Sequence, residues 1–144
     1  MIVRTSSALL FLLLTGACTQ SAGITVLSAS GVYDANAPGA SVLFRSDRTL
    51  TAFRDDVRPV EGILSICGQG DRYSSSGAVT ATADPAIYSV VFPPMADRVD
   101  FEPDGRVSGG WPADKVRSEG ICFRLEAAEM LWLTLTTNEV VLPR

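Results

Sequence analysis

Histidine is absent from this chain of 144 residues, and lysine occurs once, as Lys115. Histidine is the side chain that most often acts as a general base at neutral pH and most often binds zinc or copper. Its absence therefore excludes most hydrolase and metalloenzyme mechanisms. The serine run Ser74–Ser76 has no histidine partner, and Lys115 does not follow a serine in an S-x-x-K pattern, so we interpret the run as a polar loop.

An excess of basic charge and a long apolar run are also missing. With 12 basic and 16 acidic residues the formal net charge is −4, whereas nucleic-acid-binding domains normally carry a basic patch. No apolar stretch approaches the ~20 residues that a membrane-spanning helix needs. We therefore expect no nucleic-acid partner and no transmembrane helix, and nothing in the sequence indicates a cofactor.

The N-terminus has the organisation of an export signal. Arg4 supplies a positive charge, residues 8–14 form a short apolar core, and the small residues 15–17 lead to Cys18. Because the apolar core is too short to cross a bilayer, the segment is predicted to be cleaved rather than retained as a helical anchor.

The residues Leu14-Thr15-Gly16-Ala17-Cys18 resemble the lipobox of bacterial lipoproteins. In that family a peptidase cuts before the cysteine, whose sulfur carries a diacylglycerol and whose new amino group is acylated, typically with palmitate. Cys18 is the matching residue. The family prefers an aliphatic residue three positions before the cysteine, where this chain has Thr15. The alternative is an ordinary secretory signal that is cut after Ala17 or Ala22.

The resemblance implies a membrane-anchored protein of the bacterial envelope. Residues 1–17 are then the cleaved signal, 18–23 a lipidated tether, and 24–144 a single β domain. Several acyl chains on one residue anchor a protein firmly. In Gram-negative family members an aspartate after the cysteine favours the inner membrane; Thr19 stands there, so the resemblance points to the outer membrane, facing the periplasm. A soluble periplasmic protein is the alternative.

The remaining cysteines fit an oxidising compartment. If Cys18 is acylated, Cys67 and Cys122 form an even pair, which in an exported protein predicts a disulfide. In the chain-entropy model, whose mechanism is debated, closing so long a loop stabilises the fold by about 4 kcal/mol. Two separately buried thiols are the alternative.

After the N-terminal segment, apolar and polar residues alternate in short runs, which is the pattern of β-strands. The sequence therefore predicts an all-β fold, either a small antiparallel barrel or a sandwich of about 8–10 short strands with one disulfide. Clusters of turn-forming residues separate the runs. The predicted strands are 24–28, 41–45, 49–53, 62–67, 78–82, 87–92, 99–101, 121–125, 131–135 and 140–142.

Three local details refine this pattern near the C-terminus. In the run that begins at Cys122, alternation places Cys122 and Arg124 on one face and Phe123 on the other. Leu125–Met130 contains good helix formers but is too short for an isolated helix, so we interpret it as a turn or a single helical turn. Thr137–Glu139 is expected to be another turn.

Asp100, Glu102 and Asp104, followed by Gly105, resemble the first half of a calcium-binding loop. The twelfth position is Trp111 instead of a bidentate glutamate, and no helices are expected on either side. A β-hairpin that turns at Asp104-Gly105 is therefore the favoured interpretation, with weak calcium ligands as the alternative.

Trp111 follows two glycines and precedes a proline. An aromatic residue in such a loop either fills the end of a barrel or anchors a partner, since aromatic side chains dominate interface hot spots. We favour the first interpretation and keep Trp111 as a candidate binding residue.

Two classes of function remain. The first is a non-enzymatic envelope lipoprotein whose β domain binds an envelope protein or a small ligand. In outline it is similar to the periplasmic inhibitors of lysozyme or proteases, although their diagnostic motifs are not found. The alternative is a small periplasmic enzyme that uses carboxylates or a bound calcium ion; two converging acids of raised pKa in a cleft would favour it.

Overall fold

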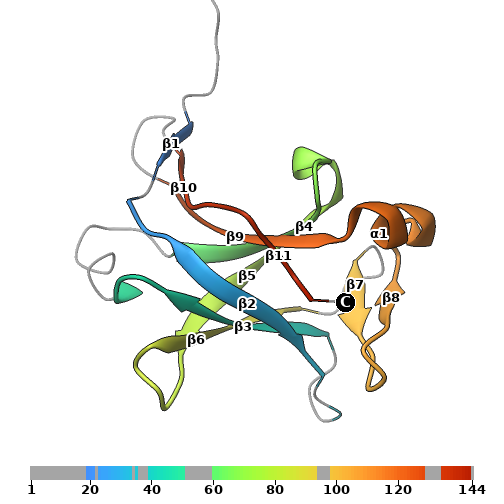
Figure 1. The fold of residues 1–144 in the computed structure, drawn as a ribbon, viewed down its shortest axis with the longest axis horizontal. Helices are drawn as coiled ribbons and strands as arrows, with labels where there is room; N and C mark the ends of the chain where they lie inside the picture. The colour runs from blue at the N-terminus through green and yellow to red at the C-terminus, as the bar shows by residue number, and fades with distance from the viewer. Residues whose placement is uncertain are drawn as a thin grey trace, which may run out of the picture.

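The computed structural model describes residues 19–21, 23–33, 35, 39–50, 60–93, 98–128 and 134–143. These residues form eleven strands and one α-helix, and nine of the strands belong to one sheet that curls into a half-barrel (Figure 1). The all-β prediction is therefore confirmed. The strands are β1 (Thr19–Ser21), β2 (Val26–Val32), β3 (Ala40–Ser46), β4 (Val60–Ile66), β5 (Ser74–Ala81), β6 (Ile87–Phe92), β7 (Val99–Phe101), β8 (Val107–Gly109), β9 (Ile121–Ala128), β10 (Thr134–Thr136) and β11 (Val140–Val141).

The large sheet has the order β1-β10-β9-β4-β5-β6-β3-β2, and β11 also pairs with β9. Its neighbours are antiparallel except for β1 and β10, which run parallel. Strands β7 and β8 form a separate hairpin, and helix α1 (Ala113–Glu119) precedes β9. In Figure 1 the hairpin and α1 lie at one end of the molecule, and β1 and β10 lie at the other.

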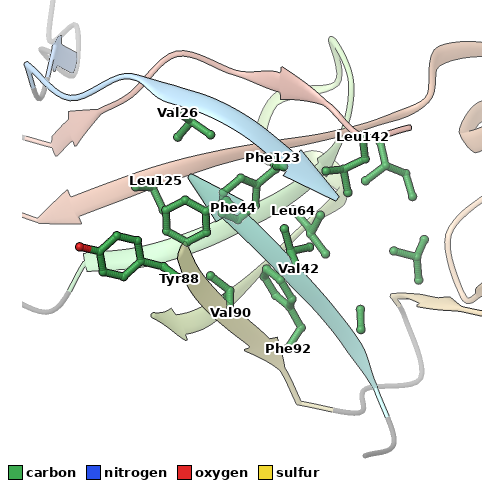
Figure 2. Close-up of a cluster of buried hydrophobic side chains, with 14 of the residues drawn as sticks. Val26, Val42, Phe44, Leu64, Tyr88, Val90, Phe92, Phe123, Leu125 and Leu142 are labelled. Carbon is green, nitrogen blue, oxygen red and sulfur yellow. The ribbon is translucent and has the colours of Figure 1, made fainter. Parts of the chain in front are cut away.

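The core lies on the concave face of the sheet, where alternate residues of each strand point inward (Figure 2). Its buried phenylalanine and tyrosine side chains come from β3, β6 and β9, and β4 adds Leu64 and Ile66, as the period of two requires. Phe44 of β3 packs between Tyr88 of β6 and Phe123 of β9, because its ring centroid is 5.5 Å from that of Tyr88 and 5.1 Å from that of Phe123. The inward pairs are Ala40 with Phe92, Val42 with Val90, Phe44 with Tyr88, Leu64 with Phe123, and Ile66 with Ile121.

The interpretation of Leu125–Met130 as a turn or helical turn is wrong, because β9 continues as a strand to Ala128. Glu126 and Ala127 pair with β4 on one side and with β10 on the other. Two sets of sheet hydrogen bonds satisfy this backbone, and such pairing outweighs the weak helical preference of these residues. Glu129 and Met130 lie outside the described residues.

The interpretation of Ser74–Ser76 as a loop is also wrong, since these residues begin β5. They pair with Ser65, Leu64 and Ile63 of β4. Serine forms a strand here because the central strand β4 supplies backbone partners. A short 3₁₀ helix, η2 (Gly70–Tyr73), makes the connection between the two strands.

Thr137–Glu139 is a β-bulge rather than a turn. Thr136 pairs with Glu126 and Val140 with Phe123, so three residues on this side lie opposite two residues of β9. A bulge bends its strand and redirects side chains. Here it continues β10 into β11 along the same partner strand.

Other predicted boundaries differ from the structure near the N-terminus. The strand expected at 24–28 begins at Val26 and extends to Val32. Residues 19–21 of the expected tether form β1, which pairs with β10. Of the strand expected at 49–53, residues 51–53 lie outside the described residues, as do residues 131–133 of the strand expected at 131–135.

Candidate ligand-binding site

A pocket of about 510 Å³ lies between the β7–β8 hairpin, helix α1 and the end of the chain. Its volume is in the range of small-molecule sites. Most of its lining is apolar, and its polar side chains belong to exposed residues, namely Asp104, Arg106, Ser108 and Arg117. The lining residues are Val99, Phe101, Asp104, Gly105, Arg106, Val107, Ser108, Gly109, Trp111, Ala113, Val116, Arg117, Gly120, Ile121, Leu142 and Pro143.

The floor of the pocket belongs to the hydrophobic core. Val99, Trp111, Ile121 and Leu142 are each no more than 6% exposed and pack in the core cluster. The walls are different, because the apolar side chains of Phe101, Val107 and Val116 are only half-buried. Strands β7 and β8 and helix α1 thus each present apolar surface that the rest of the protein does not fully cover.

The hairpin wall forms as the sequence predicted. Asp104 and Gly105 make its turn, where the Gly105 N–H donates to the Glu102 carbonyl and the Glu102 N–H donates to the Arg106 carbonyl, at 3.0 and 2.8 Å. Gly105 has a φ of +79°, which favours glycine. Strands β7 and β8 then pair from Val99 to Gly109.

Close contacts close the base of this hairpin, where Arg98 directly precedes β7, and pack the hairpin against β2. A Cβ atom on Gly109 would lie 1.7 Å from the Arg98 carbonyl oxygen, so only glycine fits there. The neighbouring Gly110 N–H donates to the same oxygen at 2.7 Å. Phe101 lies over Gly31 of β2, where a Cβ atom would come within 2.5 Å of the ring.

Helix α1 was not predicted, although its ends carry recognisable signals. Pro112 is its N-cap residue, and Gly120, with φ +84°, follows its last residue. Asp114 in the first turn and Arg117 in the last complement the helix dipole. The helix has only seven residues, too few to show a clear apolar period.

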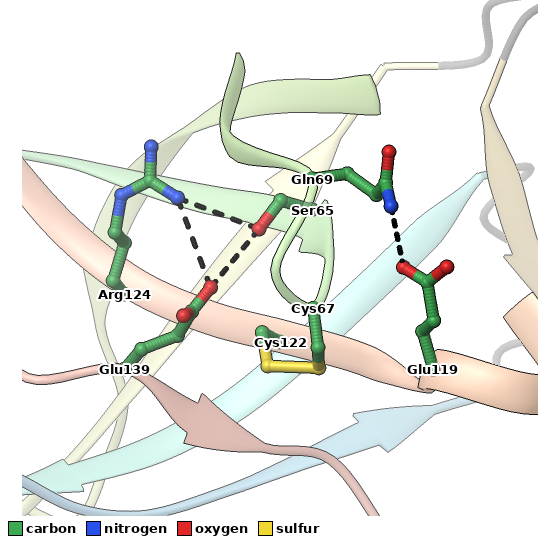
Figure 3. Close-up of a disulfide and its surroundings, with 7 residues drawn as sticks. All are labelled: Ser65, Cys67, Gln69, Glu119, Cys122, Arg124 and Glu139. Atoms are coloured by element: carbon green, nitrogen blue, oxygen red, sulfur yellow. Dashed lines mark hydrogen bonds and ion pairs between the residues drawn. A yellow bond between two sulfur atoms is a disulfide. The ribbon is translucent and has the colours of Figure 1, made fainter. Parts of the chain in front are cut away.

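The loop after β4 holds α1 in place (Figure 3). The Gln69 side chain donates a hydrogen bond of 2.8 Å to the Glu119 carboxylate, and the Cys67 N–H donates to the Gly120 carbonyl at 3.1 Å. The predicted disulfide is confirmed, with an S–S distance of 2.06 Å between Cys67 and Cys122. It joins the strand pair β4–β9 directly beside the pocket wall.

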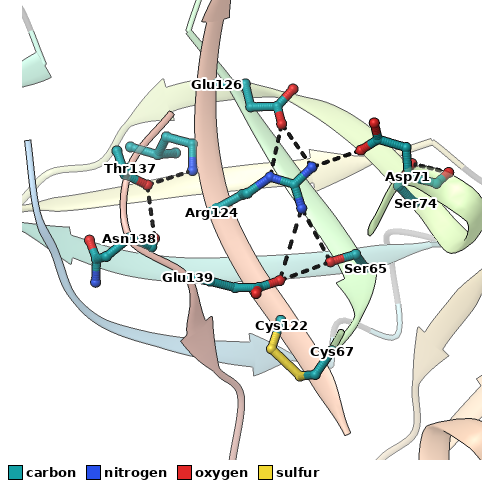
Figure 4. A network of polar contacts seen from close by, with 11 residues as sticks. Ser65, Cys67, Asp71, Ser74, Cys122, Arg124, Glu126, Thr137, Asn138 and Glu139 are labelled. Carbon is teal, nitrogen blue, oxygen red and sulfur yellow. Dashed lines mark hydrogen bonds and ion pairs between the residues drawn. A yellow bond between two sulfur atoms is a disulfide. The ribbon is translucent and has the colours of Figure 1, made fainter. Parts of the chain in front are cut away.

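The disulfide lies on the outer face of the sheet, together with Arg124, as alternation predicted. Arg124 is the centre of a charged network in which its guanidinium is 2.8 Å from Glu126, 3.0 Å from Asp71 and 3.9 Å from Glu139 (Figure 4). Ser65 donates to Glu139 at 3.2 Å and accepts from Arg124 at 3.4 Å. This network covers the outer surface of β4 and β9.

Two arginines and one aspartate supply the charges of the pocket lining. The Arg106 side chain donates to the Asp104 carboxylate, which also accepts a 3.0 Å hydrogen bond from the Arg106 backbone N–H. These contacts, the backbone bond first, lower the pKa of Asp104 from its ordinary value, so the carboxylate is ionised at neutral pH. Arg117 is exposed, and no carboxylate of the described residues forms an ion pair with it.

The candidate calcium ligands do not converge. Glu102 accepts a hydrogen bond of 2.6 Å from the Ser108 hydroxyl, and Asp104 is bound by Arg106. Among the described residues, no group of three or more histidine, cysteine, aspartate or glutamate side chains is placed to hold a metal ion. The segment with Asp100 is the predicted hairpin.

Trp111 is the candidate that the structure places in the pocket, where it is buried in the floor at the end of the half-barrel. Cys18 lies outside the described residues. Sequence reasoning missed Val116 and Arg117, whose only signal was the proline and glycine at the two ends of α1. Within the described ranges, no helix is both long and apolar enough to cross a membrane.

Comparison with known proteins identifies no relative: no family model, curated protein or solved structure matches the chain.

Proposed function

We propose that this chain is a non-enzymatic lipoprotein of the bacterial envelope whose β domain binds a small ligand in the pocket beside Trp111. The observation that carries the proposal is the apolar wall surface of Phe101, Val107 and Val116 around a volume of about 510 Å³. Apolar pockets with a few polar groups at the mouth are the usual form of small-molecule sites. A small ligand therefore fits this feature better than an envelope protein does.

The chemistry of the lining supports binding rather than catalysis. The chain has no histidine, and among the described residues Asp104 is the only one with a carboxylate side chain that lines the pocket. A carboxylate enzyme needs a second acid or base beside it. Asp104 is already bound by Arg106, and its pKa is lowered rather than raised, which is opposite to the shift that a general acid needs.

The anchor is proposed on the lipobox-like residues Leu14–Cys18, with the outer membrane as the location and the periplasm as the compartment that the domain faces. Intact mass spectrometry of protein extracted from separated inner and outer membranes tests this. We expect an acylated mature mass in the outer-membrane fraction and loss of acylation in Cys18→Ala. A soluble, unacylated product would contradict the anchor and leave the pocket proposal intact.

Ligand binding is tested with the full chain in phosphatidylcholine nanodiscs, carrying Trp132→Phe so that Trp111 is the only tryptophan. The probe is 11-bromoundecanol, whose bromine quenches tryptophan fluorescence on contact. We expect saturable quenching, because the apolar chain covers the walls. Quenching that does not saturate would show partition into lipid only and would overturn the proposal.

Val116→Phe provides the steric control, since the larger side chain occupies pocket volume. We expect it to abolish saturable quenching. The matched control is Val91→Phe, which adds the same ring at an exposed position of β6 that does not line the pocket. Equal quenching in both variants would place the probe elsewhere.

A further inference from the structure

We infer that the ligand is an anionic amphiphile, a single apolar chain that ends in an oxyanion, with Arg117 binding the oxyanion. This inference rests on the proposed function and specifies the ligand class of the same pocket. A carboxylate and a phosphate both present oxygen acceptors that suit a guanidinium group, so the shared chemistry is a chain with a carboxylate or phosphate end.

The apolar part of the ligand follows from the distribution of side chains with depth. The floor residues Val99, Trp111 and Ile121 are buried, and Phe101 and Val116 in the walls are half-buried. A polar group placed against these side chains would lose its hydrogen bonds to water without replacement, which is unfavourable in an apolar environment. An alkyl chain loses nothing comparable and gains by leaving water.

The negative charge proposed for the head group of the ligand follows from the two arginines that line the pocket. Arg106 is neutralised by Asp104, with which it makes both a backbone and a side-chain contact. Arg117, in the last turn of α1, has no such carboxylate among the described residues. Among the described lining residues, Arg117 thus carries a positive charge that no ion pair compensates, in a chain whose formal net charge is −4.

Asp114, three residues before Arg117 on α1, forms no ion pair with it, and two other carboxylates are already hydrogen-bonded elsewhere. Glu119 accepts a hydrogen bond from Gln69, and Glu102 accepts one from Ser108. Neither glutamate lines the pocket. An oxyanion at the mouth can thus pair with Arg117 while its chain covers the apolar walls, whereas a cationic head would be repelled.

The test compares two probes that differ only in the head group. Full-length Trp132→Phe protein in phosphatidylcholine nanodiscs is titrated at pH 8 with 11-bromoundecanoate and with 11-bromoundecanol, and Trp111 quenching is recorded. We expect the carboxylate to bind about tenfold more tightly, as a charge-assisted hydrogen bond allows. Decyl phosphate and decanoate, added as competitors, then distinguish a phosphate from a carboxylate end.

Arg117→Gln removes the charge and keeps a polar side chain of similar length. We expect it to reduce the affinity for the carboxylate about tenfold and to leave that for the alcohol unchanged. Arg45→Gln is the matched control, because Arg45 is exposed on β3 and does not line the pocket. Thermal unfolding of both variants checks that they are folded.

The outcomes separate the two proposals. Equal affinity for the two probes, or an Arg117→Gln variant that still prefers the carboxylate, overturns the inference and leaves the apolar pocket as a binding site. Absence of saturable quenching by either probe overturns the proposed function itself.

Discussion

The side-chain amide of Asn138 occupies the position that a neighbouring strand would take beside Val26. It accepts a hydrogen bond of 2.7 Å from the Val26 N–H and donates one of 3.0 Å to the Val26 carbonyl. The bulge at 137–139 directs it there, and Thr137 in the same bulge accepts from the Leu125 N–H at 2.9 Å. Two side chains thus replace backbone pairing where the bulge interrupts it.

The first prediction concerns this contact. Asn138→Ala leaves the Val26 N–H, in a residue only 2% exposed, without its acceptor. We expect the free energy of unfolding to fall by about 1–3 kcal/mol. Denaturant unfolding measures the loss, and hydrogen exchange at the Val26 amide should become faster.

Asn138→Asp, compared with Asn138→Ala at a pH where the carboxyl group is protonated, is the control, because it then accepts from the Val26 N–H and donates to the Val26 carbonyl. We expect a smaller loss of stability. If Asn138→Ala left both the unfolding free energy and the exchange rate unchanged, the amide would have no part in holding β2.

At the scale of elements, the pocket depends on a hairpin and a short helix that are attached to the sheet rather than part of it. The hairpin packs on β2 where Phe101 covers Gly31, and its base is closed where Gly109 and Gly110 meet the Arg98 carbonyl. Helix α1 is held by Gln69 in the loop after β4. Such small elements bury little surface by themselves, so specific contacts determine their position.

The second prediction compares two glycines of the hairpin. In Gly109→Ala the new Cβ atom meets the Arg98 backbone, which cannot give way as a flexible side chain would. In Gly105→Ala the backbone φ of +79° is also unfavourable, but no atom lies within 4 Å of the new Cβ. We expect Gly109→Ala to lose at least 2 kcal/mol more stability, an order-of-magnitude figure for a steric conflict of this kind.

Thermal unfolding and quenching of Trp111 by 11-bromoundecanol together check this comparison. Both glycines line the pocket, so a difference between the variants reports the close packing at the base of the hairpin and not contact with the probe. Similar stability in the two variants would show that the hairpin moves freely enough to accommodate the methyl group.

At the scale of the whole molecule, strand β1 and the pocket lie at opposite ends (Figure 1). β1 begins directly after Cys18 and pairs with β10, which pairs with the C-terminal half of β9. The pocket is lined by Ile121 at the other end of β9. The seven steps from Ile121 to Ala128 along β9 span about 23 Å, at roughly 3.3 Å per step.

The third prediction follows from this arrangement and from the proposed anchor. Because β1 uses the first residues of the tether, the anchored domain should hold its β1–β10 end near the bilayer and its pocket away from it. A fluorophore at Thr25→Cys, just before β2, should be quenched strongly by spin-labelled lipid. The same fluorophore at Asp114→Cys on α1 should be quenched much less.

Both positions are exposed, so solvent access does not distinguish them. A six-residue Gly-Ser insertion after Cys18 is the control, since a longer flexible tether should reduce the difference in quenching between the two sites. Equal quenching without the insertion would contradict the proposed orientation.

Residue order by itself determined the features that depend on neighbours along the chain. Period-two alternation placed Phe123 inward and Arg124 outward, Asp104-Gly105 predicted the hairpin turn, and elimination paired Cys67 with Cys122; the structure confirms all three. Steric preferences and the pleat of a strand act over two to four residues, which is why a linear pattern carries them. The lipobox at Cys18 is likewise a local motif and stays a prediction.

Only the tertiary structure decided what depends on residues far apart in the chain. Leu125–Ala128 is a strand because β4 and β10 pair with it, Ser74–Ser76 because β4 does, and Thr137–Glu139 is a bulge because β9 runs on opposite it. The pocket brings together Phe101, Val116 and Leu142, which no local pattern relates. The physical reason is that backbone hydrogen bonds and apolar contacts between distant segments outweigh weak local preferences.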